Sequence, residues 1–442
     1  MLKAVIVGAG ARGNRVFAEL MATQATGFET AGVVEPEPGR RQAFQDRYDV
    51  PDERAFATLE AFLEAPRFAD VVFICTPDVT HYAHARAVSE KGYTILLEKP
   101  IATNLPDCLA LLDVEATNRN HIFVAHVLRY SPFFRTVRDI IRSGRLGRVQ
   151  HIHLTENVAH WHYAHSYVRG NWNRQETSAP IVLTKSSHDL DLLHWLMSGE
   201  RVEWVLSYGA LKYFRREKAP PQAAERCVAC PLRDECLYSA TKFYLNERDE
   251  WPFNVIASAP DTVEARRLAL ERGPYGRCVW HHDNDVCDEQ TVLLEFEGGA
   301  HAVFGLHAHT ADNTRRLRVL FDHAELEGDL REERLTISHF TGRKNERRLE
   351  TVPLPATDDR WGHGGGDLAL LRTLHEHLTS GGEEALVTSL RSSLTSHVLA
   401  FLAEDSRLND NVRIPVPDIF PPGSLELPPP PTLVFEEEQR NN

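Results

Sequence analysis

The chain has 442 residues, 42% of them hydrophobic and 25% charged, which is the composition of a folded protein of two or three domains. Its formal net charge of -14 argues against nucleic-acid binding, because phosphate backbones attract clustered Lys and Arg. No apolar run approaches the about 18 residues that cross a bilayer, and Met1-Leu2-Lys3 leads into a strand pattern instead of a signal peptide. We therefore expect a cytoplasmic protein with a small polar ligand and no membrane or nucleic-acid partner.

The first 125 residues alternate short β-branched apolar runs with stretches of helical periodicity. This alternation predicts an α/β domain, a doubly wound Rossmann sheet of parallel strands. The expected strands are residues 2–7, 31–34, 71–75, 94–97 and 121–125, and the clearest expected helices are residues 14–22, 39–47 and 79–91.

Residues 126–413 predict a second, α+β domain with an open, mainly antiparallel sheet, because longer strand patterns follow one another through Gly-rich or charged turns. We expect strands at 148–156, 203–211, 290–296, 300–308, 314–321, 324–330 and 333–339, and helices at 131–141, 186–197, 366–379 and 389–405. A Cys-rich insertion of weak periodicity occupies about 212–286. The Pro-rich tail, 414–442, should run extended over the surface, because Pro lacks a backbone donor.

A glycine motif joins the first strand to the first helix, and it predicts a dinucleotide site. Gly8 permits the tight turn, Gly10 leaves room for the pyrophosphate, and Gly13 lets helix and strand pack closely. The helix then begins at Ala11 and Arg12, whose free backbone N–H groups face the negatively charged pyrophosphate.

An acidic residue after the second strand favours NAD. Glu35 follows Gly13 by about 20 residues, where a carboxylate binds the adenosine ribose and repels a 2′-phosphate. Arg12, Arg40 and Arg41 lie close enough in sequence to keep NADP open. The turn after the third long strand adds Thr76 and Pro77, which we expect beside the nicotinamide ribose, and His81 at the start of the next helix.

The glycine turn, Thr76-Pro77, Glu98-Lys99-Pro100 and Ser187-His188-Asp189-Leu190-Asp191 together resemble the Gfo/Idh/MocA family, the relatives of glucose–fructose oxidoreductase and inositol dehydrogenase. The likeness covers residues 1 to about 210 by motif and to about 405 by architecture, without the insertion and the tail. It implies a Rossmann domain, a C-terminal open-sheet domain, NAD(P), and oxidation or reduction of sugars, inositols and related polyols.

The resemblance also implies roles for single residues. Lys99 matches the lysine that touches substrate hydroxyl and cofactor, Glu98 precedes it at the cofactor, and Pro100 matches an often cis proline. His188 matches the acid/base histidine. These roles make chemical sense, because oxidising a carbinol needs a proton acceptor and a cation beside the developing alkoxide.

This sequence departs from the family pattern four residues before the histidine. Thr184 stands where the family has Asp, and Lys185 follows as a candidate second catalytic cation at the substrate. Asp189 or Asp191 is then expected to orient His188 by accepting its other N–H. The exchange leaves direct transfer of the family mechanism open.

Residues 160–172 combine aromatic rings and polar donors, as sugar sites do. We expect Trp161 and Trp172 to stack on a sugar ring and Arg169 to bind an anionic group, with Arg129 as a weaker neighbour. Packing of these aromatics under the sheet is the alternative.

The insertion carries a cysteine pattern. Cys227, Cys230 and Cys236 are separated by two and five residues, and Cys278 follows about 40 residues later. We predict a structural zinc site, with an iron–sulfur cluster second and free thiols as the alternative.

These features predict an NAD(P)-dependent oxidoreductase that acts on a secondary hydroxyl of a sugar, cyclitol or sugar derivative. Two alternatives remain: a glycosidase that oxidises its substrate transiently with bound NAD, and a non-catalytic NAD-binding sensor. We also expect a homo-oligomer, since the exposed face of an open sheet favours self-association.

Overall fold

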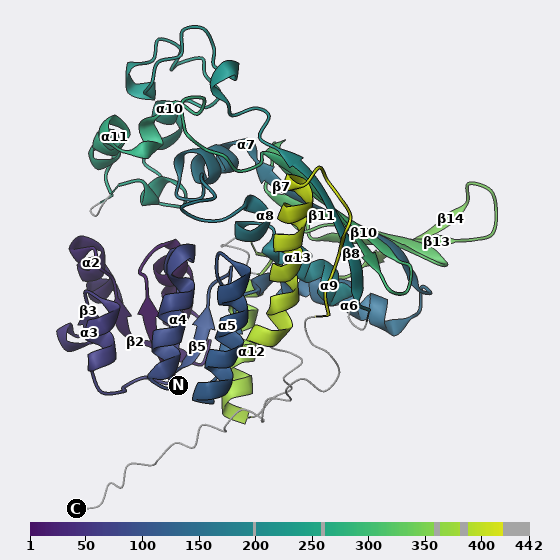
Figure 1. Cartoon of the computed structure of the whole chain (residues 1–442), viewed down its shortest axis with the longest axis horizontal. Helices are drawn as coiled ribbons and strands as arrows, with labels where there is room; N and C mark the ends of the chain where they lie inside the picture. The colour runs from purple at the N-terminus through teal and green to yellow at the C-terminus, as the bar shows by residue number, and fades with distance from the viewer. Residues whose placement is uncertain (198–199, 258–260, 358–362, 381–387, 419–442) are drawn as a thin grey trace, which may run out of the picture.

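The computed structural model describes residues 1–197, 200–257, 261–357, 363–380 and 388–418. Within these ranges the chain forms two β-sheets, each covered by helices, and an insertion that rises above the second sheet (Figure 1). No helix in the described ranges is both long and apolar enough to cross a membrane.

The first sheet is entirely parallel, with strand order β3-β2-β1-β4-β5-β6, which confirms the predicted doubly wound Rossmann topology. Its strands are β1 (Leu2–Val7), β2 (Phe28–Val34), β3 (Ala55–Phe56), β4 (Val71–Ile74), β5 (Thr94–Leu97) and β6 (Ile122–Val124). Helices on its two faces are η1 (Ala11–Ala18), α1 (Glu19–Thr23), α2 (Pro38–Tyr48), α3 (Leu59–Glu64), α4 (His81–Glu90) and α5 (Leu105–Asn118). Because the strands are covered on both faces, they read as continuous apolar runs.

Two helices from the C-terminal part of the chain complete this first domain, although they follow the second sheet in sequence. They are α12 (Gly366–Ser380) and α13 (Leu390–Leu408). Leu370 and Leu374 share a core with Leu2, and Leu390 shares the opposite core with Val5. Figure 1 shows α13 beside α5, whereas α12 packs on the other face of the first sheet. The predicted boundary at residue 125 therefore separates the two sheets, but α12 and α13, which follow it in sequence, pack with the first sheet.

The second sheet is mixed and open, with strand order β14-β13-β12-β11-β7-β10-β9-β8-β15 in the described residues. The strands are β7 (Val149–Ala159), β8 (Val202–Ala210), β9 (Glu289–Phe296), β10 (His301–Thr310), β11 (Thr314–Phe321), β12 (Ala324–Asp329), β13 (Arg334–Phe340), β14 (Arg347–Val352) and β15 (Ile414–Pro415). Only β7 and β10 pair in parallel among these strands. The sequence did not predict the short β14, and β15 lies at the edge, where Pro415 is tolerated.

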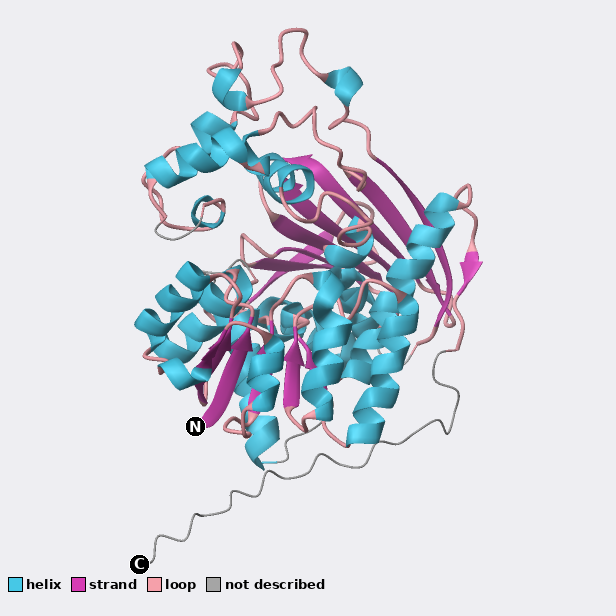
Figure 2. Ribbon diagram, turned by 60° about the vertical axis from the view of Figure 1, so that its left-hand side comes forward, coloured by secondary structure: helices cyan, strands magenta, loops and turns pink. Residues whose placement is uncertain are grey.

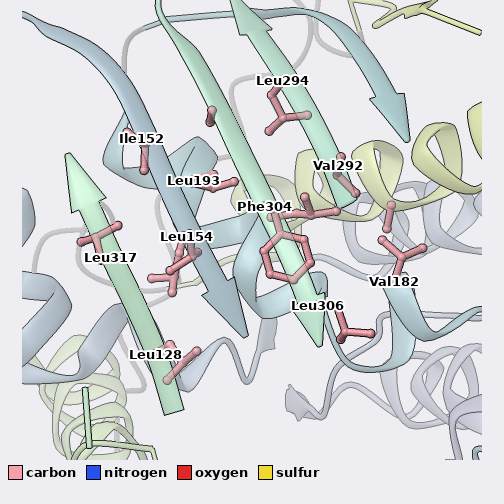
Figure 3. Close-up of a cluster of buried hydrophobic side chains, with 14 of the residues drawn as sticks. Leu128, Ile152, Leu154, Val182, Leu193, Val292, Leu294, Phe304, Leu306 and Leu317 are labelled. Atoms are coloured by element: carbon pink, nitrogen blue, oxygen red, sulfur yellow. The ribbon is translucent and has the colours of Figure 1, made fainter. Parts of the chain in front are cut away.

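One face of this sheet packs on helices and forms a closely packed core (Figure 3). The helices around it are η4 (Val127–Tyr130), α6 (Pro132–Ser143), α7 (His160–Tyr163), η5 (Ala164–Arg169), α8 (Ile181–Thr184) and α9 (Ser187–Leu196). Leu193 of α9 and Val182 of α8 meet Phe304 of β10 in this core. The packing fixes α9, and therefore the first turn that carries His188, against a rigid sheet.

The insertion contains two short α-helices, α10 (Ala240–Tyr244) and α11 (Val263–Arg272), with isolated helical turns. It has a small core of its own around Tyr244, Phe253 and Leu270. Figure 2 shows it above the second sheet, on the side that faces the Rossmann helices.

Candidate active site

The glycine turn has the geometry of a pyrophosphate cradle. Gly8 has φ +94°, and a Cβ there would lie 2.7 Å from the carbonyl oxygen of Cys75. A Cβ on Gly13 would lie 2.1 Å from the carbonyl oxygen of Gly8, whereas a Cβ on Gly10 would meet nothing within 4 Å. Two glycines are therefore needed by the fold, and Gly10 leaves an open surface at the start of η1, which suits a phosphate.

Glu35 is held beside this turn at the end of β2. Its carboxylate is 3% exposed and accepts hydrogen bonds from the backbone N–H of Ala9 (2.9 Å) and of Glu37 (3.1 Å). Arg40 approaches it at 3.4 Å, and Arg41 donates to the Glu35 carbonyl oxygen at 2.6 Å. A fixed negative charge therefore lies where the adenosine ribose of a dinucleotide would bind.

We expect Glu35→Gln to raise the affinity for NADP relative to NAD by about fivefold. The amide keeps the acceptor for Ala9 but loses a charge whose repulsion of a phosphate is on the order of 1 kcal/mol. Calorimetric Kd values for both dinucleotides test this. An unchanged ratio would mean that Glu35 does not face the ribose.

Arg12 does not serve the adenosine end of the site. Its guanidinium pairs with Glu98 at 2.5 Å and with Asp367 of α12 at 2.7 Å. These carboxylates raise the pKa of Arg12 against the effect of burial, and Arg12 and His363 hold the pKa of Asp367 well below its usual range despite burial. The possibility that Arg12 selects NADP is therefore not supported, while Arg40 and Arg41 remain near the ribose position.

His81 joins two turns at the carboxyl edge of the sheet. Its ring nitrogens lie 2.9 Å from the carbonyl oxygen of Thr76 and 2.6 Å from that of Pro100. The Lys99-Pro100 bond is cis, as the family resemblance implied. With His81 buried, the Thr76-Pro77 turn and the Lys99 turn form one unit beside the glycine turn.

Lys99 reaches from β5 into the second domain. Its ammonium group donates to the carbonyl oxygen of Thr184 at 2.5 Å. Burial lowers its pKa to about 8, with Lys185 and Arg12 acting in the same direction and Asp78 and Glu98 opposing them. Lys99 is therefore mostly cationic at pH 7 but close to losing its proton.

His188 lies in the first turn of α9, four residues after Thr184, and is 5% exposed. Burial lowers its pKa well below the usual value, and the charge of Lys99 is the next largest cause. Its imidazole is therefore neutral near pH 7, which is the state that can accept a proton. The charge of Lys99 thus acts on the imidazole of His188 in this structure.

A buried ion-pair network lies next to His188 and corrects two expectations. Lys185 pairs with Glu156 of β7 at 3.1 Å, and Arg315 of β11 bonds both Glu156 and Asp189 at 2.7 Å. Lys185 is therefore compensated instead of presenting a free charge to a substrate. Asp189 serves Arg315 and does not orient His188; burial raises its pKa to about 6.

Two family models match the chain, one over residues 2–126 and one over residues 138–403. They describe an oxidoreductase family with an NAD-binding Rossmann fold and a C-terminal alpha/beta domain. The chain belongs to the Gfo/Idh/MocA oxidoreductase family. It is accordingly an NAD(P)-dependent oxidoreductase.

Relatives and solved structures agree with this assignment. YteT of Bacillus subtilis, to which an oxidoreductase activity is ascribed, is 26% identical and is matched over 85% of this chain and 88% of its own length. An inositol 2-dehydrogenase of Leifsonia xyli is 28% identical over 45% of this chain and 52% of its own length. An inositol dehydrogenase homolog of Azotobacter vinelandii, solved with NADH and myo-inositol, has a TM-score of 0.63 at 16% identity and covers 94% of this chain and 97% of its own.

The two predicted sugar-stacking tryptophans of this Gfo/Idh/MocA protein lie in different surroundings. Trp172 donates from Nε1 to Asp78 at 2.9 Å, and the charge of Asp78 acts on Lys99, so Trp172 belongs to the site. Trp161 packs on the insertion, with its ring centroid 5.7 Å from that of Trp251.

Neither arginine predicted to bind substrate is free to do so. Arg129 is buried and forms a bidentate ion pair with Asp191. Arg169 is 3% exposed and donates to the carbonyl oxygens of Tyr238 (2.7 Å) and Arg277 (3.1 Å). Both guanidiniums therefore form contacts within the protein and are not available to bind a ligand.

The predicted metal site is not supported. Cys227, Cys230, Cys236 and Cys278 do line one cavity together with Arg169. Yet no group of three or more His, Cys, Asp or Glu side chains among the described residues is arranged to hold a metal ion. The Arg169 guanidinium lies 3.7 Å from the Cys227 sulfur, and burial raises the pKa of Cys236 and raises that of Cys278 to about 11.

We expect Arg169→Met to destabilise the protein without changing substrate binding. The variant leaves two buried carbonyl oxygens without a donor, at about 1–3 kcal/mol each. Thermal unfolding should show a lower Tm, and the KM of the folded variant should stay within twofold. An unchanged Tm with a raised KM would instead indicate that Arg169 binds the substrate.

Proposed function

We propose that this protein transfers a hydride between NAD and a secondary hydroxyl of a sugar, cyclitol or related polyol. The observation that carries the proposal is the pair formed by cationic Lys99 and neutral, buried His188 beside the glycine turn. A carbinol carbon held between them meets a proton acceptor and a positive charge at the same oxygen.

His188 and Lys99 have different roles in the proposed reaction. His188 accepts the hydroxyl proton, because its neutral imidazole is the only form with a free lone pair. Lys99 stabilises the negative charge that develops on the same oxygen. The dinucleotide, when bound, supplies the hydride acceptor. The hydrogen bond from Lys99 to Thr184 holds the two domains at this point.

A neutral polyol fits the site better than an anionic sugar. Of the cations that the sequence offered for an anionic group, Lys185 is paired with Glu156, Arg129 with Asp191, and Arg169 with backbone carbonyls. Trp172 and Asp78 remain near Lys99, and an indole face with a carboxylate suits ring C–H groups and hydroxyls. The relatives named inositol 2-dehydrogenase support this class.

We also propose that the protein is a cytoplasmic homo-oligomer. Its cysteines in the described residues are all free, as in a reducing compartment. Tyr208, Phe340 and Leu349 on the second sheet are each more than half exposed, at 54%, 59% and 59%. Light scattering should give a mass above that of one chain.

A substrate panel tests the proposed function. NADH formation is followed with inositols, aldoses and glycosides, and we expect turnover on at least one neutral cyclic polyol. Single replacements of Lys99 and His188 should remove it. NAD binding without turnover across the panel would instead indicate a sensor.

A further inference from the structure

A histidine that sequence reasoning passed over lies directly behind His188. His126 follows β6, is 1% exposed, and has no hydrogen-bond partner at either ring nitrogen within the described part of the chain. Leaving a buried polar group unpaired costs about 1–3 kcal/mol. A buried polar group without a partner calls for an explanation, and a hydrogen bond made only during catalysis is one such explanation.

One ring nitrogen of the neighbouring His188, Nδ1, is likewise unpaired among the described residues. The two ring centroids are 5.6 Å apart with the planes at 78°. On its other side, Nδ1 of His126 lies 3.8 Å from Oδ2 of Asp191. A third imidazole, His397, is at 5.6 Å but already bonds Ile101 and Ser393 at 2.9 Å.

We propose that His126 is the positioning residue for His188, in a chain that runs from Asp191 through His126 to His188. In this chain Nδ1–H of His126 faces Asp191, and Nε2 of His126 accepts the Nδ1–H of His188. The Nε2 of His188 is then the unprotonated nitrogen and faces the substrate hydroxyl. The inference rests on the proposed function, since it concerns how its base is oriented.

The charges around His126 fit this arrangement. Burial lowers the pKa of His126 well below the usual value, and Arg129 and Lys99 act in the same direction. A neutral imidazole has one donor and one acceptor, which is what the chain needs. The near-perpendicular rings must turn to align the hydrogen bond, and catalytic hydrogen bonds commonly tighten only when ligands bind.

The residue at position 184 explains why His188 needs another partner to orient it. Thr184 cannot orient His188 as a carboxylate does, and Asp189 is bonded to Arg315. Asp191, which also forms the bidentate ion pair with Arg129, is the next carboxylate along the helix, and the ring of His126 lies near both Asp191 and His188. His126 thereby supplies the orientation that no neighbouring acid provides.

The kinetic test compares His126→Phe with His126→Gln. Phe keeps the ring volume without hydrogen bonds, whereas Gln can place an acceptor near the position of Nε2. We expect Phe to lower kcat about 10- to 100-fold, with the KM and the NAD Kd within about twofold, and Gln to recover most of the loss. The matched control is His377→Phe: His377 of α12 is a buried histidine that packs on Phe123 of β6, and this variant should keep kcat. Unchanged kcat in His126→Phe, or equal losses in Phe and Gln, would overturn the proposal.

A second measurement needs no turnover and separates this inference from the proposed function. In ¹⁵N-histidine-labelled protein with NAD, the His188 signals are assigned as those lost in His188→Gln. We expect the proton of His188 on Nδ1 in the wild type and a mixture of tautomers in His126→Phe. The same tautomer in both proteins would overturn the proposal even if a substrate is found.

Discussion

Replacement of Lys99 by Met is expected to lower kcat/KM for the polyol substrate about 100- to 1000-fold. Lys99 is the buried cation at the oxygen where negative charge develops, and removing one such group has an effect of this size. The Met side chain keeps much of the volume, so the glycine turn should be intact and the NAD Kd should change little. Steady-state kinetics and calorimetry measure the two quantities on the same preparation.

A retained rate in Lys99→Met would remove the lysine from the mechanism. A lost rate together with lost NAD binding would mean that the lysine supports the dinucleotide site instead. The account is supported only if Lys99→Met loses the rate and keeps the NAD Kd of the wild type.

The pH dependence of the rate follows from the same residue. Burial lowers the pKa of Lys99 to about 8, and burial keeps the pKa of His188 well below its usual value. The rate of polyol oxidation should therefore fall as the pH rises through about 8, where Lys99 loses its charge. A rate that stays level to pH 10 would contradict this.

Stability should change in the opposite direction over this range. The unfolded chain binds a proton at Lys99 up to about pH 10.5, whereas the folded chain releases it at about 8. The unfolded state therefore holds more protons between these values, so the contribution of Lys99 to the free energy of unfolding rises with pH. Lys99→Met should lack this rise, which urea unfolding at pH 7 and 10 can measure.

The second large effect is expected at the glycine turn, where two substitutions should separate folding from binding. Gly10→Ala adds a Cβ with nothing within 4 Å, so the Tm should hold. The same methyl group points into the pyrophosphate space, and we expect the NAD Kd to rise about 10- to 100-fold, the equivalent of a clash of about 1–3 kcal/mol.

Gly13→Ala is the matched counterpart. Its Cβ would lie 2.1 Å from a backbone oxygen of Gly8, so the turn must shift and the Tm should fall. Thermal unfolding with and without NAD distinguishes the two variants. A Gly10→Ala protein that binds NAD as the wild type does would show that the pyrophosphate does not lie on this turn.

Sequence reasoning located the dinucleotide site because its elements follow one another along the chain. The first strand, the glycine turn and the following helix are local, and Glu35 comes one strand later. Lys99 could be placed because the carboxyl ends of parallel strands share one edge. His188 came from the family resemblance, and the bond from Lys99 to Thr184 agrees with the expected meeting of the domains.

The missed residues are those whose partners lie far away in the sequence. Asp367 pairs with Arg12 across 355 positions and belongs to a helix assigned to the other domain. Glu156 looks like one more residue of a strand until Lys185 and Arg315 meet it. His126 carries no local motif at all.

The predictions that Arg129 and Arg169 bind the substrate were wrong for a related reason. A sequence shows that Arg129 or Arg169 is near a site, but not that an internal acceptor already holds it. The cysteines illustrate the same limit, because their spacing predicted a zinc site but not that Arg169 lies among them.

Transfer of deuterium tests the central claim most directly. A polyol that turns over is prepared with deuterium on its carbinol carbon, and the NADH formed is examined by mass spectrometry. We predict one deuterium on the nicotinamide ring and a slower rate with the labelled polyol. Unlabelled NADH, or release of the deuterium into water, would contradict hydride transfer at the site formed by Lys99 and His188.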